Sequence, residues 1–291
     1  MTAGGVVPEL LMTATAAATV FSVMFVVGLG IPLREFRWVW QHPGLAAKGL
    51  FSVLIAVPAI ALVVTRAFDL PRPAEIGIVL MAIAPGAPVA LRRSLGAGGH
   101  RSFAPALQIL VATVAVFSMP ATIALLNELY GGHASIDPGH LARQVLVAQL
   151  VPLGTGMLIR TALPALADWL EPRLARIATT LLVALAILAI ADIGLVTVNA
   201  GPRVALAIVA VTACALAIGH LMGGPDPATR TSVAISSAAR NPGLALLVAS
   251  INAAPPTITA TILAYLLVSA LTVVPYVVWR KHAARHGGAA S

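Results

Sequence analysis

Long apolar segments separated by short polar connections run from one end of the chain to the other. The connections contain turn residues or charges and leave no room for a soluble domain. This pattern predicts an all-α polytopic membrane protein of about nine transmembrane helices in a single domain, residues 1–291. Apolar stretches of about 20 residues, enough to cross a bilayer as α-helix, lie near residues 9–31, 45–66, 74–97, 103–127, 140–161, 175–198, 203–222, 229–252 and 256–279.

Two of these segments are interrupted near their centres by proline and glycine. The third segment contains Pro85-Gly86, and the eighth contains Asn241-Pro242-Gly243. Proline removes a backbone donor and clashes with the preceding turn, and glycine adds conformational freedom. Asn241 followed by Pro242 is also typical of a helix start. Each interrupted segment therefore predicts two half-helices, and the second one places a helix N-terminus, with its partial positive charge, near mid-membrane.

The two interrupted segments hold corresponding places in the chain. Each is preceded by two spans and followed by one, and the span near 140–161 reverses the sense of the second group. This layout predicts an inverted repeat with two crossing discontinuous helices, the first repeat covering about 9–130 and the second about 140–281. In secondary transporters, such crossings near the middle of the membrane hold the substrate.

Composition and charge support a membrane transporter and argue against other classes. The chain is 59% hydrophobic and 10% charged, whereas a soluble domain has roughly 25% charged residues. The net charge of +8 does not indicate nucleic-acid binding, because no basic run with interleaved aromatic residues occurs. With the N-terminus outside, Lys and Arg favour the cytoplasmic side by about three to one. We therefore predict a multi-pass protein of the plasma (inner) membrane with its N-terminus outside and its C-terminus in the cytoplasm.

Motifs of catalysis and metal binding are missing from the sequence. There is one cysteine, Cys214, and neither a nucleophile–base pair nor His-rich metal spacing. The glycine cluster near 96–99 lacks the GK[ST] ending of a phosphate-binding loop. The sequence thus predicts neither an enzyme nor a cofactor or metal centre.

The residues around the two interruptions resemble the bile acid/sodium symporter superfamily, and the resemblance covers almost the whole chain. It implies a panel domain beside a core domain in which two discontinuous helices cross, with the panel near 9–31, 140–161 and 175–198. Relative to ten-span members, the resemblance leads us to expect that the first span is missing. The family carries bile acids and other organic anions, usually with sodium. The resemblance rests on Val23 to Gly30, Phe36, His42-Pro43, Pro85-Gly86, Pro152 to Gly156 with Arg160, and Asn241-x-Gly243-Leu244-Ala245.

The chain departs from the sodium-coupled members at both interruptions. The second interruption of those members carries Glu-x-Gly-x-Gln-Asn, and here the matching positions are Ser236, Ala238, Arg240 and Asn241. Where those members have Ser-Asn after the first interruption, this chain has Ala90-Leu91. Arginine has donors and no acceptor, so it does not bind sodium, and we do not expect standard two-sodium coupling. A sodium site would need other ligands, because the usual ones are absent.

One hypothesis is that the Arg240 guanidinium stands where sodium would sit. A fixed cation there holds the half-helices together and attracts a substrate carboxylate in bidentate geometry. The alternative is that Arg240 only binds the C-terminal carbonyls of the first half-helix. Asp192, an acid within an apolar run, is the coupling candidate, since it could carry a proton or pair with Arg240; the alternative is a solvated residue in the outer half.

These observations predict a secondary active transporter of a small or amphipathic organic anion that works by alternating access. One alternative is a sodium-coupled symporter of bile acids or organic anions, and another is a transporter-like anion sensor or receptor. The expected partners are the anion, the lipid bilayer and a coupling proton, with no nucleic acid. Gln108 and Gln149 are interpreted as interhelical packing contacts. The predicted substrate-binding residues are Arg240, Asn241, Pro242, Gly243, Pro85, Gly86, Ala87 and Ser236.

Overall fold

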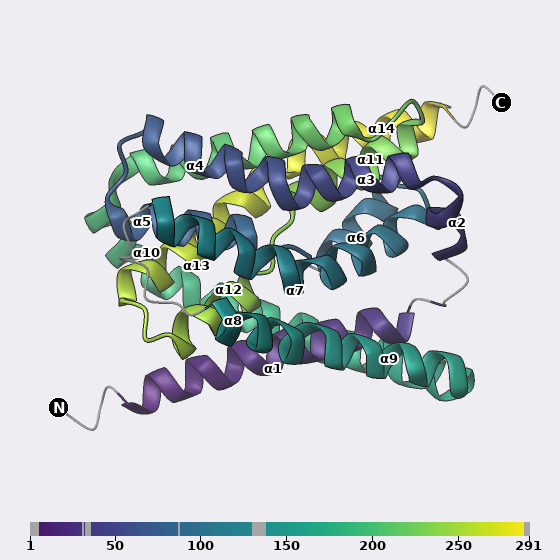
Figure 1. Cartoon of the computed structure of the whole chain (residues 1–291), viewed down its shortest axis with the longest axis horizontal. Coiled ribbons are helices and arrows are strands. Elements are labelled where there is room, and N and C mark those ends of the chain that lie inside the picture. The colour runs from purple at the N-terminus through teal and green to yellow at the C-terminus, as the bar shows by residue number, and fades with distance from the viewer. Residues whose placement is uncertain (1–5, 31, 33–35, 87, 130–137, 288–291) are drawn as a thin grey trace.

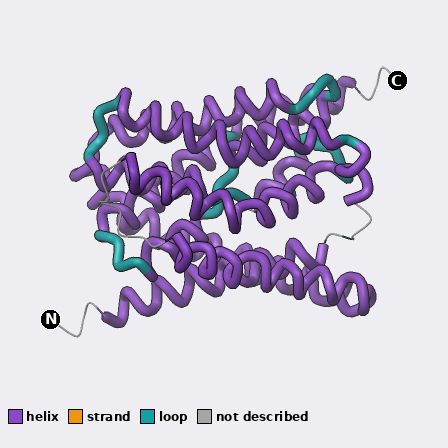
Figure 2. Tube along the Cα trace, in the orientation of Figure 1, coloured by secondary structure: helices purple, strands orange, loops and turns teal. Residues whose placement is uncertain are grey.

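The computed structural model describes residues 6–30, 32, 36–86, 88–129 and 138–287. Over these residues the chain consists of helices and short loops (Figures 1 and 2). The helices are α1 Val6–Gly30, α2 Phe36–Gln41, α3 Pro43–Phe51, η2 Ser52–Ala56, α4 Val57–Ala67, α5 Arg72–Ile83, α6 Pro88–Gly96, α7 Phe103–Leu129, α8 Pro138–Val145, η3 Leu146–Leu150, α9 Val151–Ala162, α10 Pro164–Met222, α11 Pro227–Ala238, α12 Pro242–Ile251, α13 Pro256–Thr272 and α14 Val274–Gly287.

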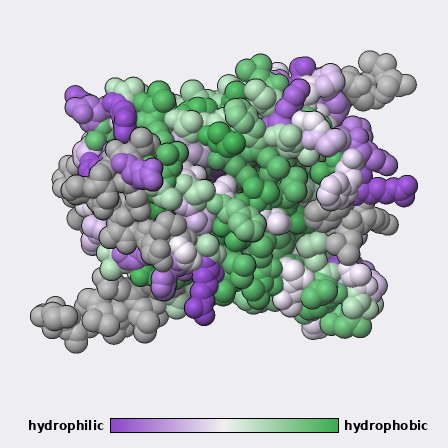
Figure 3. Space-filling view, viewed as in Figure 1, coloured by the Kyte–Doolittle hydropathy of each residue, from purple (hydrophilic) through white to green (hydrophobic). Residues whose placement is uncertain are grey.

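The long helices lie roughly side by side across the molecule (Figure 1). In Figure 1, α1 and α9 run side by side along the lower edge, and α3, α4, α11 and α14 lie along the upper edge. Helix α1 contacts α9, α10 and α12. Hydrophobic side chains occupy the middle of the face seen in Figure 3, and hydrophilic ones gather toward its left and right ends. This distribution is what a bilayer crossing the middle of the molecule requires.

Five described helical segments are long and apolar enough to cross a membrane. Helix α12 and the part of α1 from Ala14 to Gly30 are also apolar but shorter. The number of about nine spans therefore stays a prediction, whereas the all-helical, multi-pass character is established. The five segments are Pro43–Ala67, Phe103–Leu126, Gly139–Ala162, Gly201–Met222 and Pro256–Arg285.

Helix α10 contains two of the predicted spans. The backbone turns at Gly201, and this turn separates them. This residue has φ 66° and ψ 173°, outside the helical region. Only glycine adopts such a conformation readily, and Pro202 follows it with no N–H to donate. The chain thus changes direction between the segments predicted near 175–198 and 203–222.

Helices also end where the sequence carries its two central interruptions. Helix α5 ends at Ile83 and α6 begins at Pro88, while α11 ends at Ala238 and α12 begins at Pro242. The Asn241 side chain accepts a hydrogen bond from the Leu244 N–H at 3.1 Å, as an N-cap does. Figure 2 shows loop segments near the centre of the molecule as well as at its two ends.

Glycines allow α1 and α9 to approach at backbone distance. A Cβ added to Gly28 would overlap the carbonyl oxygen of Leu153, and one added to Gly156 would overlap that of Phe25. Arg160 lies near the end of this contact, where its Nε donates to the carbonyl of Leu29 and one terminal nitrogen donates to Asp168 at 2.6 Å. Close packing of small residues is a usual way for membrane helices to associate, so α1 and α9 form one tightly packed unit.

Candidate functional site

The segments between α5 and α6 and between α11 and α12 meet in the interior. Pro85 and Arg240 form an isolated antiparallel bridge. The Asn241 N–H donates to the carbonyl of Ala84 at 2.9 Å. Two backbone groups that a continuous helix would have paired are therefore satisfied across the contact. We refer to Ala84 to Gly86 and Ala239 to Asn241 as the crossing.

Arg240 is buried at the crossing, with 5% of its surface exposed. Its Nη1 donates to the carbonyls of Ala82, at 2.8 Å, and Val53, at 3.1 Å. Its Nη2 donates to the carbonyl of Ser237. Among the described residues no carboxylate pairs with this guanidinium. The charge is therefore stabilised by carbonyl dipoles from α5, η2 and α11.

Each of these carbonyls lacks its helical partner for a local reason. Ala82 and Ser237 lie in the last turns of α5 and α11, where carbonyls have no following N–H. Val53 lies inside a helix, but in a π-helical turn where the Val57 N–H donates to Ser52 instead. The next residue is Pro58, which has no N–H. The local sequence thus releases the Val53 carbonyl, and Arg240 binds it.

Three buried N–H donors beside the crossing have no partner among the described residues. They are Nε of Arg240, Nδ2 of Asn241 and Nε2 of Gln108 on α7. Gln108 is 3% exposed, and its Nε2 would lie 2.8 Å from a Cβ on Gly86, which has φ +86°. These donors accompany the N-terminus of α12, which carries the partial positive charge of a helix start. The crossing therefore offers hydrogen-bond donors to an acceptor.

Other predicted site residues lie around the same point. Ser236 is 7% exposed, and its neighbour Ser237 shares a hydroxyl hydrogen bond of 2.8 Å with Ser52. Pro242 opens α12. A Cβ on Gly243 would lie 2.8 Å from Cγ2 of Val20, so α1 closes over the start of α12. Helix α1 thus covers the start of α12, next to the crossing, in this structure.

Two predicted residues fall wholly or partly outside the described structure. Ala87 lies outside it, and Asp192 is placed as part of helix α10 but its side chain is not among those described. The coupling role of Asp192 stays a prediction. Among the described residues, no group of three or more His, Cys, Asp and Glu side chains could hold a metal ion.

The structure adds residues that the sequence did not single out. Tyr265 on α13 is fully buried. Gln108 was interpreted as a packing contact, and the structure places its unpaired Nε2 donor beside the crossing. The sequence held one signal for the unpaired carbonyl of Val53, which is Pro58. Proline has no N–H, so it cannot donate to the Val53 carbonyl within the helix.

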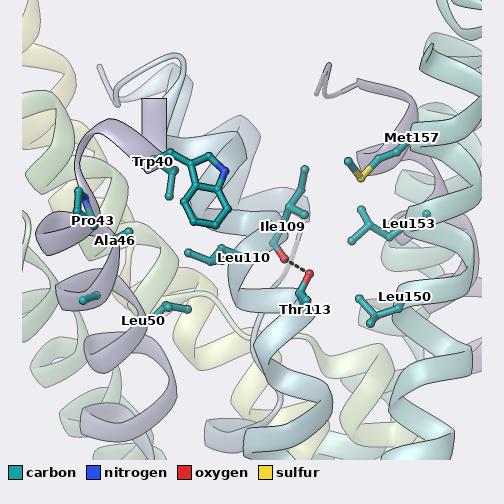
Figure 4. Close-up of a pocket in the computed structure, with 13 residues that line it drawn as sticks. Trp40, Pro43, Ala46, Leu50, Ile109, Leu110, Thr113, Leu150, Leu153 and Met157 are labelled. Atoms are coloured by element: carbon teal, nitrogen blue, oxygen red, sulfur yellow. Dashed lines mark hydrogen bonds between the residues drawn. The ribbon is translucent and has the colours of Figure 1, made fainter. Parts of the chain in front are cut away.

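A groove of about 560 Å³ lies on another side of α7, between α2 and α3 on one wall and η3 and α9 on the other (Figure 4). Trp40 stands at one side of this groove, with Leu153 and Met157 opposite it. The groove shares no lining residue with the crossing. Its lining residues are Val39, Trp40, Pro43, Ala46, Ala47, Leu50, Ile109, Leu110, Thr113, Leu150, Leu153, Gly154 and Met157.

Comparison with known proteins identifies the class to which this fold belongs. The model of the sodium bile acid symporter family matches residues 17–200. The chain therefore belongs to this family, which consists of membrane transporters rather than enzymes. The resemblance expected from the sequence is confirmed.

Individual relatives are distant and match part of the chain. The rice "probable sodium/metabolite cotransporter BASS3, chloroplastic" is 25% identical over 151 residues, which is 52% of this chain and 35% of that protein. The human "P3 protein" is 24% identical over 138 residues, which is 47% of this chain and 29% of that protein. The matched region spans about a third of the length of these relatives.

Proposed function

We propose that the protein is a secondary active transporter of a small or amphipathic organic anion. The observation that carries this proposal is the set of unpaired donors at the crossing: Nε of Arg240, Nδ2 of Asn241 and Nε2 of Gln108. Buried polar groups rarely remain without a partner. A carboxylate supplies acceptors only, and it is also the group attracted by a guanidinium and a helix N-terminus.

In this proposal the chain is an inverted repeat. Its two halves are residues about 9–130 and about 140–281, and they meet at the crossing. The meeting of Pro85 with Arg240 at the centre supports it, as does the start of a new helix at Pro88 and at Pro242. Alternating access then requires α1 to separate from α12, because the Gly243–Val20 contact closes this side of the crossing.

Arg240 replaces the coupling cation at the crossing. Three carbonyls from separate segments surround its guanidinium, which is how oxygen ligands surround a bound metal ion. The charge is permanent, so the site has its cation without sodium from solution. Asp192 is then the candidate for a coupling proton. The protein lies in the plasma (inner) membrane with its C-terminus in the cytoplasm, as the bias of Lys and Arg favours.

The first experiment measures thermal stability of the purified protein with keto acids, pantoate-like acids and bile acids, each in sodium and in choline buffer. A ligand at about a hundred times its dissociation constant adds about 2.7 kcal/mol to the unfolding free energy. We expect one class of anion to stabilise the protein equally in both buffers. Uptake of that anion into proteoliposomes then tests transport, and binding without uptake would support a sensor or receptor instead.

Arg240→Gln tests the role of the fixed cation in the same assays. We expect anion binding and uptake to fall at least tenfold. Arg230→Gln is the matched control, because the Arg230 Nε also binds a backbone carbonyl, that of Gly224, but away from the crossing. Full retention of uptake by Arg240→Gln would contradict the proposal. Stabilisation of the wild-type protein that requires sodium would instead favour a sodium-coupled symporter with other ion ligands.

A further inference from the structure

We propose that the crossing binds a chloride ion, held by the three unpaired N–H donors found there. This inference rests on the proposed function and adds an inorganic anion to the same site. The donors are Nε of Arg240, Nδ2 of Asn241 and Nε2 of Gln108, and these residues are 5%, 4% and 3% exposed. A buried donor costs free energy when nothing accepts from it, so an acceptor at this point stabilises the protein.

The charge of Arg240 favours an anion over a neutral acceptor. Its two terminal nitrogens donate to backbone carbonyls, and Nε is the nitrogen that remains. Among the described residues, no carboxylate pairs with this guanidinium. A buried charge carries a desolvation cost that an opposite charge offsets. Water would satisfy the donors, but it would not neutralise the charge.

The groups beside Arg240 present donors toward the crossing. Oδ1 of Asn241 accepts from the Leu244 N–H at 3.1 Å, which fixes the orientation of the amide and leaves Nδ2 free. Nε2 of Gln108 would lie 2.8 Å from a Cβ on Gly86, so this donor approaches the backbone of the crossing. The N-terminus of α12 adds its partial positive charge. A hard cation such as Ca²⁺ needs oxygen ligands, whereas this set of donors favours an anion.

The enclosure of the donors favours a monatomic anion while α1 lies against α12. A Cβ on Gly243 would lie 2.8 Å from Cγ2 of Val20, so α1 closes over the start of α12. An organic acid needs space for the body beside its carboxylate, whereas chloride needs contact only with the donors. Chloride therefore occupies the donors in the closed arrangement, and the substrate carboxylate replaces it when α1 separates from α12. The two anions compete, because they need the same donors.

Chloride titration of the purified wild-type protein is the first test. Thermal unfolding is measured while sodium gluconate is exchanged for sodium chloride, at constant sodium and constant ionic strength. We expect the unfolding midpoint to rise with chloride and to saturate, because a ligand of the folded state stabilises it by mass action. An unfolding midpoint that does not respond to chloride would overturn the proposal and leave water as the partner of the donors.

Gln108→Glu supplies an anion from the protein itself. The carboxylate has nearly the shape of the amide and neutralises the charge of Arg240, so the unfolding midpoint should become independent of chloride. Gln149→Glu is the matched control, because Gln149 is also a buried glutamine with an unpaired amide, on η3 rather than α7. We expect this control to respond to chloride as wild type does. Gln108→Leu only removes a donor and should raise the chloride dissociation constant about tenfold.

Equal responses of Gln108→Glu and Gln149→Glu to chloride would contradict the proposal, as would an unchanged chloride affinity in Gln108→Leu. Uptake of the organic anion is then assayed in gluconate and in chloride. Competition for the donors predicts that chloride raises the KM for uptake and leaves the maximal rate unchanged. Uptake that ignores chloride would refute the shared site and leave organic anion transport intact. Stabilisation by chloride without any organic anion uptake would refute transport and leave the chloride site intact.

Discussion

Two close contacts in this protein bring distant parts of the chain together by opposite means. At the crossing, buried polar groups meet, and Arg240 ties α5, η2 and α11 through their carbonyls. Between α1 and α9, the glycines Gly28 and Gly156 let two backbones touch, and Arg160 adds one hydrogen bond to the Leu29 carbonyl near the end of the contact. The first contact depends on directional hydrogen bonds, and the second mainly on shape.

This difference suggests which contact changes during transport. At the crossing, Nε of Arg240 and Nδ2 of Asn241 are unpaired, so a ligand can bind them without displacing the existing hydrogen bonds. Backbone contact between glycines has no such substitute, because close-packed surfaces lose their dispersion energy as soon as they separate. We therefore expect α1 and α9 to move together, and the crossing to rearrange when α1 leaves α12.

The largest expected effect is that of Arg240→Met on stability. The variant leaves three buried carbonyls without a donor, and each costs about 1–3 kcal/mol. We expect the free energy of unfolding to fall by about 3–5 kcal/mol, the usual cost of removing one partner of a buried charged contact. Thermal unfolding in detergent measures it. Arg92→Met on the exposed side of α6 is the control, and an equal, small loss in both variants would show that the carbonyls do not depend on Arg240.

A smaller loss is expected from Gly28→Ala, and also from Gly156→Ala. Each added methyl overlaps a carbonyl oxygen of the other helix, so α1 and α9 must move apart. Overpacking of this kind costs about 1–3 kcal/mol. Gly154→Ala on the same helix meets open space and should be neutral or stabilising, as helix propensity predicts. Unchanged melting of Gly28→Ala would mean that the helices can separate freely.

Asn241 allows the two properties of the crossing to be measured separately. Asn241→Ala removes the cap of α12 and should cost about 1 kcal/mol. Asn241→Asp keeps the capping oxygen but replaces the Nδ2 donor with a second acceptor. We expect this variant to melt near wild type while anion uptake falls by at least tenfold. If both variants transport normally, Asn241 is a cap and not a ligand.

The smallest expected effect lies at the edge of the α1–α9 unit. Asp168 binds Arg160 at 2.6 Å, but its side chain is 71% exposed. Exposed ion pairs contribute about 0–1 kcal/mol, so Asp168→Asn should lower the unfolding free energy by less than about 1 kcal/mol. Thermal unfolding at low and high salt measures this, and a loss comparable to that of Gly28→Ala would show that charge rather than packing holds α1 to α9.

The sequence by itself determined the class of the protein, because its signals are local. Apolar runs long enough for a bilayer predict membrane helices whatever their neighbours are. Pro-Gly pairs prevent helix at Pro85-Gly86 and favour a new start at Asn241-Pro242. These same residues carried the resemblance to the symporter family; membership is confirmed by the family match over residues 17–200, which includes Pro85-Gly86 but not Asn241-Pro242.

Only the tertiary structure decided what those residues contact. Arg240 is separated from Val53 by 187 positions and from Ala82 by 158, and no local pattern relates them. The unpaired Nε2 donor of Gln108 beside the crossing and the groove between α3 and α9 likewise depend on how helices pack. Such contacts arise from the surfaces of several helices together, whereas propensity and hydropathy act along one segment of chain.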